Sequence, residues 1–271
     1  MSGTNIAERV SGQPAALLTA LLVAVIVAGG CSGTVPPPTP TAPTSAPDPG
    51  SEAPSTATPR ATPSLPGAAP SVTTGPPILF GGEGVLEAGT YVIRLLPHGF
   101  PNVLITVPDG WSTDTDWYVG TPGYISGVLF WNVVDVYAHP CRWKGPLVHP
   151  GPTVDDLVAA LVAQPLRNAT KPVDVTIDGY RGKQLEWSVP DDIDFANCDD
   201  RDDAGPPTFE SWTATGWASD RYQQSPGQID RLWILDVAGA RLVIDAQFQH
   251  GATKQQIAEL MQVVESIRFE R

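Results

Sequence analysis

The chain has few positively charged residues, which restricts the partners that it could bind. Its 271 residues include 16 Lys and Arg against 29 Asp and Glu, for a formal net charge of -13 at pH 7. Nucleic-acid binding needs a basic patch that contacts phosphates, so we expect no nucleic-acid partner. Anionic lipid headgroups would repel the chain as well, so any membrane attachment has to come from another source.

Sequence motifs for common enzyme reactions are also lacking. There is no Gly-x-Ser-x-Gly nucleophile elbow, no Walker A loop and no Gly-rich dinucleotide fingerprint. We therefore expect no catalytic residue and no cofactor. An exported hydrolase with a dispersed Ser-His-Asp triad remains an alternative, because triads are defined by geometry and not by spacing.

Only one long hydrophobic run is present, near the N-terminus. Residues 15–28 are uncharged but too few for a bilayer-spanning helix, which needs about 20 residues, and they are typical of a secretory signal peptide. Residues 27–32, Val-Ala-Gly-Gly-Cys-Ser, resemble a bacterial lipobox. The resemblance predicts a signal peptide over residues 1–30, a lipid on Cys31 and a location on the extracellular face of the cell membrane. An ordinary cleaved signal and an uncleaved anchor are the alternatives.

Cysteine is scarce. Once Cys31 is assigned to the lipid, only Cys141 and Cys198 remain. Export places both thiols in an oxidising compartment, where pairing is the default state, so we predict a disulfide between them. On the chain-entropy model, a loop of this length stabilises the fold by about 3 to 4 kcal/mol. Two free thiols or a metal-binding pair are the alternatives.

Proline, in contrast, is abundant and concentrated. Residues 34–77 hold 14 of the 29 prolines, no aromatic residue and only three charged ones, Asp48, Glu52 and Arg60. Such a stretch cannot bury enough apolar surface to offset the entropy that ordering would cost. We therefore predict that residues 31–77 form a lipidated, disordered spacer that lifts a folded domain off the membrane. A Pro-rich ligand for a partner protein is the alternative.

Residues 78–271 have the pattern of a single α+β domain. Helices are predicted after the N-caps Thr153 and Thr253, the first ending at Pro165 and the second carrying Gln256 as capping-box partner. Because most strands come in hairpins and the helices occur singly, we predict a mostly antiparallel sheet with two helices packed on it, acting as a monomer. The predicted strands cover residues 89–96, 102–107, 126–138, 173–177, 181–189, 209–218, 229–237, 240–249 and 267–269.

Several strings in this domain point to a protein family. They include Val-Pro-Asp-Gly-Trp at 107–111, Thr-Val-Asp-Asp-Leu at 153–157, Asp-Gly-Tyr-Arg-Gly-Lys at 178–183 and Val-Val-Glu-Ser-Ile at 263–267. These strings resemble a group of uncharacterised actinobacterial exported proteins and lipoproteins. The order of elements is similar to the α/β/α sandwich of the Mog1/PsbP type, found in some mycobacterial lipoproteins. This second resemblance implies a non-catalytic binding or accessory domain.

Metal sites are weakly supported. The carboxylates of residues 191–203 could coordinate calcium, but the calcium-loop pattern fails, because Ala196 occupies the third ligand position and the closing Glu is missing. His139, Cys141 and His149 lie close in sequence without the spacing of a zinc site. We therefore expect no metal and interpret the acidic segment as a solvated loop.

The eight Trp residues all lie in the domain, most of them within predicted strands. We interpret them mainly as packing residues, with pocket lining or a sugar-stacking platform as alternatives. The sequence thus predicts a membrane-anchored envelope lipoprotein whose domain binds a small apolar ligand, a cell-wall component or an envelope partner protein. A purely structural domain is a further alternative.

Overall fold

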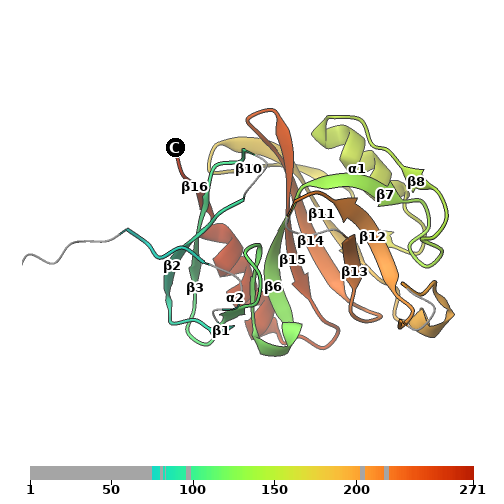
Figure 1. Ribbon diagram of the computed structural model, residues 1–271, viewed down its shortest axis with the longest axis horizontal. Coiled ribbons are helices and arrows are strands. Elements are labelled where there is room, and N and C mark those ends of the chain that lie inside the picture. The colour runs from blue at the N-terminus through green and yellow to red at the C-terminus, as the bar shows by residue number, and fades with distance from the viewer. Residues whose placement is uncertain (1–74, 80–81, 83, 96–98, 202–204, 217–219) are drawn as a thin grey trace, which may run out of the picture. The chain divides into compact units, whose positions relative to one another are not determined.

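The structure is a computed structural model that describes residues 75–79, 82, 84–95, 99–201, 205–216 and 220–271. A nine-stranded antiparallel sheet forms its centre. Its strands are β1 (Gly84–Val85), β4 (Ser112–Thr113), β5 (Tyr118–Gly120), β6 (Ser126–Trp131), β9 (Asn168–Ala169), β10 (Val173–Ile177), β11 (Tyr180–Ser188), β14 (Ile229–Val237) and β15 (Ala240–Phe248). They pair in the order β1-β4-β5-β6-β15-β14-β11-β10, and β9 pairs with β11 outside this order (Figure 1).

Two smaller sheets and two helices complete the described part. The strands of the smaller sheets are β2 (Gly89–Ile93), β3 (Val103–Val107), β7 (Val133–Tyr137), β8 (Leu147–Val148), β12 (Phe209–Ala214), β13 (Asp220–Gln223) and β16 (Arg268–Phe269). One sheet has the order β13-β12-β7-β8 and the other β16-β3-β2. The helices are α1 (Val154–Ala163) and α2 (Lys254–Glu265), and short 3-10 turns span Pro122–Tyr124 and Phe195–Asn197.

The predicted N-terminal features fall outside this description. Cys31, the predicted signal peptide and residues 32–74 of the predicted spacer are not among the described residues. Within the described ranges, no helix is both long and apolar enough to cross a membrane. The attachment of the protein to a membrane therefore stays a prediction from the sequence.

Side chains alternate along β15 between two hydrophobic clusters, one on each face of the central sheet. Leu242 and Ile244 pack in the cluster that contains Leu260 of α2 and residues of the β16-β3-β2 sheet. Val243 packs on the other face, in the cluster that contains Leu161 of α1 and Trp212 of β12. The two helices therefore cover opposite faces of the sheet (Figure 1). The prediction of a mostly antiparallel α+β domain with two helices is confirmed.

Both helices begin where the capping residues predict. The side chain of Thr153 accepts a hydrogen bond from the backbone of Asp156, and Thr253 does the same for Gln256. In turn, the side chains of Asp156 and Gln256 accept hydrogen bonds from the backbone N–H groups of the capping threonines, which completes a capping box at each helix. Caps of this kind contribute about 1 kcal/mol each and fix the first residue of a helix.

The segment 126–138, predicted as one long strand, forms two strands in different sheets. β6 pairs with β15 in the central sheet, whereas β7 pairs with β12. The break falls at Asn132, whose carbonyl accepts a hydrogen bond from the backbone N–H of Thr215 (3.1 Å). A run of β-branched and aromatic residues favours a strand without specifying its partner. The strand predicted over 209–218 also ends early, at Ala214, and β13 was not predicted.

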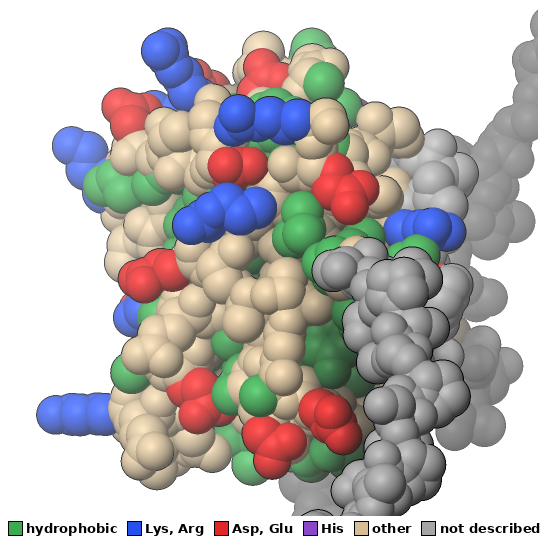
Figure 2. Space-filling model, turned by 90° about the vertical axis from the view of Figure 1, so that its left-hand side faces the viewer, with side chains coloured by type: hydrophobic (Ala, Val, Ile, Leu, Met, Phe, Trp, Pro, Cys, Tyr) green, Lys and Arg blue, Asp and Glu red, His purple; other side chains and the backbone are tan. Residues whose placement is uncertain are grey.

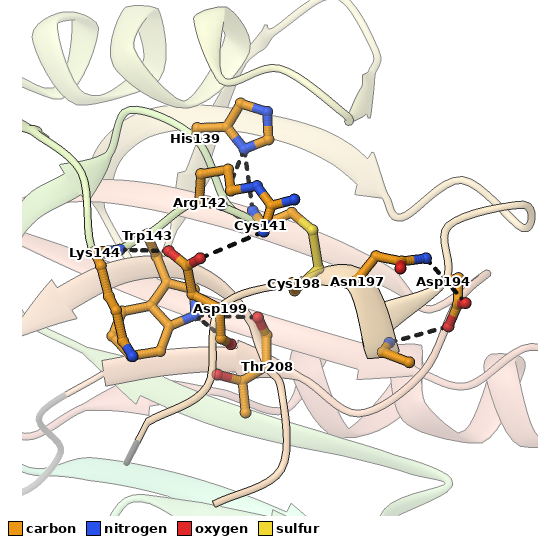
Figure 3. Close-up of a disulfide and its surroundings, with 11 residues drawn as sticks. His139, Cys141, Arg142, Trp143, Lys144, Asp194, Asn197, Cys198, Asp199 and Thr208 are labelled. Carbon is orange, nitrogen blue, oxygen red and sulfur yellow. Dashed lines mark hydrogen bonds and ion pairs between the residues drawn. A yellow bond between two sulfur atoms is a disulfide. The ribbon is translucent and has the colours of Figure 1, made fainter. Parts of the chain in front are cut away.

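Cys141 and Cys198 form the predicted disulfide, although they lie 57 positions apart in the sequence (Figure 3). The bridge joins the turn after β7 to the acidic segment before β12. Close to it, Trp143 Nε1 donates hydrogen bonds to the carbonyl oxygens of Asp199 and Thr208, both at 3.1 Å. The disulfide and these bonds tie the acidic segment to the folded domain.

Candidate functional site

An aromatic cleft of about 430 Å³ lies between the central sheet and β13, on the face of the sheet that α1 covers. We define this aromatic cleft by five of the residues that line it, Trp117, Tyr118, Tyr124, Trp131 and Tyr222. Clefts of a few hundred Å³ that combine ring faces with a few polar groups are typical of small-molecule sites. The aromatic cleft is therefore the candidate site.

A row of tryptophans in ring contact connects the aromatic cleft to the core, through one tilted pair, one edge-to-face pair and one stacked pair. The ring centroids of Trp117 and Trp131 are 4.8 Å apart, those of Trp131 and Trp212 are 5.7 Å apart, and those of Trp187 and Trp212 are 5.8 Å apart. Trp131, Trp187 and Trp212 are buried, as is Trp111 on the other face, so the packing interpretation is confirmed for these four. Trp117 is half-buried and forms part of the cleft wall. The row thus holds the wall in a fixed position.

A buried ion-pair network lies beneath the cleft and is centred on Arg221 of β13. Its guanidinium donates hydrogen bonds to Asp245 (2.7 Å), Asp230 (2.7 Å) and Gln247 (2.9 Å). The exposed fraction of Arg221 is 2%, and both carboxylates are fully buried. Charges at this depth are tolerated only when they are paired. Arg221 therefore holds β13 over β14 and β15, which supply the two carboxylates.

The environment of Asp245 makes it bind a proton more readily than a free carboxyl does. Burial raises the pKa of Asp245 from 3.8 to about 7; the carboxylate of Asp230 adds to the rise and Arg221 opposes it. Two carboxylates that share one guanidinium repel each other, so one of them retains a proton more easily than a free carboxyl. A carboxyl with this behaviour beside a cleft is a frequent feature of functional sites, although structural ion pairs produce it as well.

Several polar atoms around the floor of the aromatic cleft have no hydrogen-bond partner among the described residues. Three belong to residues that line the cleft and are more than nine-tenths buried: the hydroxyl of Tyr118, Nε1 of Trp131 and Nε2 of Gln247. Oγ1 of Thr115 and Oδ1 of Asp245 are unpaired in the same sense. Unpaired interior polar groups are costly, and each is a candidate contact for a bound molecule.

A larger hollow of about 550 Å³ lies at the start of α1, where a lysine is already paired with two carboxylates. Lys183 contacts Asp174 at 2.6 Å and Asp155 at 3.8 Å across it. On the face formed by β2, β3 and β16, acidic and basic side chains are scattered between small groups of hydrophobic residues (Figure 2). Neither surface combines depth, aromatic rings and unpaired polar groups as the aromatic cleft does.

Several carboxylates of the acidic segment are bonded to neighbouring groups of the same domain. Asp194 caps the turn Phe195–Asn197 by accepting a hydrogen bond from the backbone of Ala196 (3.0 Å), and Asp200 pairs with Lys144 (2.5 Å). Asp199 accepts a hydrogen bond from the Lys144 backbone (3.0 Å; Figure 3). Among the described residues, no three His, Cys, Asp or Glu side chains are grouped so that they could hold a metal ion.

The histidines considered for zinc are also separated. Nδ1 of His139 faces the backbone N–H groups of Cys141 (3.3 Å) and Arg142 (3.1 Å), and Cys141 is used in the disulfide (Figure 3). His149 instead contacts Asp135 of β7 at 2.5 Å, with its ring largely exposed. The structure thus does not bring His139, Cys141 and His149 together as a site.

Comparisons with known protein families, curated proteins and solved structures found no match for this chain. The resemblance to exported actinobacterial proteins therefore stays a prediction. The residues of the candidate site were not singled out by the sequence analysis, apart from the general alternative that some Trp residues line a pocket. A weak signal existed in β15, where Asp245 and Gln247 interrupt a strongly apolar strand.

Proposed function

We propose that this protein is an exported, membrane-anchored envelope lipoprotein whose folded domain binds a small ligand in the aromatic cleft. The observation that carries the proposal is the combination of ring faces with unpaired buried polar atoms, on Tyr118, Trp131 and Gln247, around one cleft. A fully apolar ligand would leave these polar atoms unpaired, so the cleft favours a cell-wall component or another ligand with hydrogen-bonding groups.

The proposed fold relationship is compatible with this function. One helix covers each face of a mostly antiparallel sheet, as in the Mog1/PsbP type of sandwich that the element order resembles. That type implies a non-catalytic binding or accessory domain. The nine-stranded central sheet and the two additional small sheets are features of this chain that the resemblance did not lead us to expect.

A hydrolase is the second candidate, and the raised pKa of Asp245 is the observation that favours it. Against it, both Asp245 and Asp230 are fully buried and bonded to Arg221, and none of the described residues that line the aromatic cleft is a histidine. A general acid has to reach its substrate. The geometry therefore supports binding better than catalysis.

Replacing Cys31 by Ser tests the anchor. We expect the variant to move from the membrane fraction to the soluble fraction, because a serine cannot accept the thioether-linked lipid and the charge of the protein gives no attraction to anionic headgroups. Fractionation of cells that express either form, followed by immunoblotting, measures the change. Ser32→Ala, which keeps the cysteine, is the control. A Cys31→Ser protein that stays in the membrane fraction would rule out the lipid assignment.

Replacing Trp117 by Ala tests the aromatic cleft. The full chain and its variants are purified from the producing organism and examined by native mass spectrometry. We expect a co-purifying mass on the wild type and about two- to tenfold weaker retention by Trp117→Ala, because stacking on a ring contributes about 0.5–1.5 kcal/mol. Trp233→Ala is the matched control, since Trp233 is equally half-buried but packs on the other face of the sheet. Bare protein in every sample, or equal retention by both variants, would contradict the proposal.

A further inference from the structure

We propose that the ligand of the aromatic cleft is a cation, an organic ammonium group held between ring faces and the carboxylates of Asp114 and Asp220. This inference rests on the function proposed above and specifies the chemical class of the ligand. Three observations support it: the distribution of charge around the cleft, the ring faces in its wall, and the contacts that arginines of the protein already make with those rings.

The two arginines that line the cleft are neutralised by other residues. Arg201 forms two hydrogen bonds with the carboxylate of Glu210, at 2.9 and 3.0 Å. Arg221 is held by Asp230 and Asp245, both at 2.7 Å. Because three buried carboxylates compensate these two guanidinium groups, neither arginine is available to an anionic ligand.

Among the lining residues that the structure describes, Asp114 and Asp220 are the remaining charged ones. Neither forms an ion pair within 4 Å among the residues that the structure describes, although Asp220 lies close enough to Arg201 for their charges to interact. Asp114 accepts a hydrogen bond from the hydroxyl of Tyr124, and Asp220 accepts one from Tyr137 (3.3 Å). The described lining of the cleft therefore carries an excess of negative charge.

The negative charge contributes to raised pKa values of the tyrosines around the cleft. Burial, a hydrogen bond and the repulsion between a phenolate and the same carboxylates all favour the neutral forms of these tyrosines. The hydrogen bond to Asp114 is the main cause that raises the pKa of Tyr124 to about 12. Burial raises the pKa of Tyr118 and Tyr137, and the charges of Asp114 and Asp220, respectively, add to these rises.

Ring faces in a negative cleft are favourable sites for cations. Cations over the face of Trp or Tyr, within about 6 Å of the centroid, are attracted by the ring quadrupole, and quaternary ammonium ligands are recognised in this way. The protein already makes such contacts in the cleft: Arg201 lies 4.8 Å from the ring centroid of Tyr222, and Arg221 lies 5.9 Å from that of Trp131. Trp117 and Tyr124 offer further faces, and the net charge of -13 would steer a cation toward the protein.

Two matched pairs of probes test the charge of the ligand by isothermal titration of the full chain. Choline is compared with its neutral isostere, in which a carbon atom replaces the nitrogen, and glucosamine is compared with N-acetylglucosamine. We expect the cation of at least one pair to bind about tenfold more tightly than its neutral partner. The double variant Asp114→Asn/Asp220→Asn should lose this preference. Asp192→Asn, which removes a charge from the exposed acidic segment, should retain it, and thermal unfolding verifies that each variant is folded.

The results separate this inference from the function on which it rests. If the neutral partners bind as tightly as the cations, or if neither member of either pair binds, the ligand is not a cation of this kind and the inference is wrong. A neutral probe that binds the wild type and is lost in Trp117→Ala would leave the binding function intact. If the double variant still prefers the cations, residues other than Asp114 and Asp220 recognise them, and the inference is also wrong.

Discussion

Replacing Arg221 by Met is expected to lower the free energy of unfolding by about 3 to 5 kcal/mol at pH 7. The change removes the only guanidinium that bonds to both Asp230 and Asp245, among the residues described, and leaves two fully buried carboxylates without their cation. Methionine keeps much of the volume of the side chain, so the loss reflects the unpaired charges more than a cavity. Urea unfolding followed by tryptophan fluorescence measures it.

The pH dependence of this loss distinguishes a charge effect from a packing effect. In the wild type, the raised pKa of Asp245 means that the folded state binds a proton more tightly than the unfolded state. The stability from this proton is fully present below about pH 4 and is lost as the pH rises through about 7. Without Arg221, Asp245 loses the positive charge that opposes its protonation, so we expect the loss to shrink as the pH is lowered toward 5. Replacing Asp245 by Asn in the otherwise wild-type protein should make the free energy of unfolding depend less on pH between about 4 and 7.

Arg231→Met is the matched control for Arg221→Met. Arg231 also lies in a strand and bonds to a carboxylate, that of Glu186 at 2.9 Å, but both partners are about one-third exposed. Partly exposed pairs contribute about 0 to 1 kcal/mol, so the control should be almost as stable as the wild type at every pH. Equal losses in the two variants would show that the network beneath the cleft has no special role in stability.

The framework of the fold could be predicted because its signals are local. The hairpin of β14 and β15 is visible as two apolar runs around Ala238 and Gly239, whose positive φ angles of 55° and 86° fit the tight turn. The caps Thr153 and Thr253 identify both helix starts. What could not be predicted depends on pairing between distant segments, such as the bend at Asn132 that sends β7 into a second sheet.

The candidate site was hidden for a related reason. In β15, Asp245 and Gln247 occupy one face, while Leu242, Ile244 and Ala246 occupy the other. This alternation is typical of a strand with one face in water. The face is instead covered by β13, whose sequence Asp-Arg-Tyr-Gln contains no β-branched residue and gives only a weak strand signal. A covering strand that the sequence does not reveal therefore turns an apparently solvent-exposed face into a buried ion-pair network.

Removing the disulfide by Cys141→Ala together with Cys198→Ala is expected to lower the free energy of unfolding by about 2 to 5 kcal/mol. The bridge closes a loop across 57 positions that contains α1, β10 and β11. Without it, the unfolded chain gains the freedom of that loop, while both cysteines occupy a small cluster with Val189 and Phe209 that alanine fills only in part. Urea unfolding of the oxidised wild type and the double variant measures the difference.

The urea dependence separates the two contributions to this loss. If constraint of the unfolded chain dominates, the unfolded double variant exposes more surface than the cross-linked chain, so its m-value should be larger than that of the oxidised wild type. If lost packing around Phe209 dominates, the m-value should stay unchanged while the midpoint falls. Wild type treated with reductant should behave like the double variant, and the double variant should not respond to reductant at all. A wild type whose unfolding is insensitive to reductant would contradict a stabilising role for the bridge.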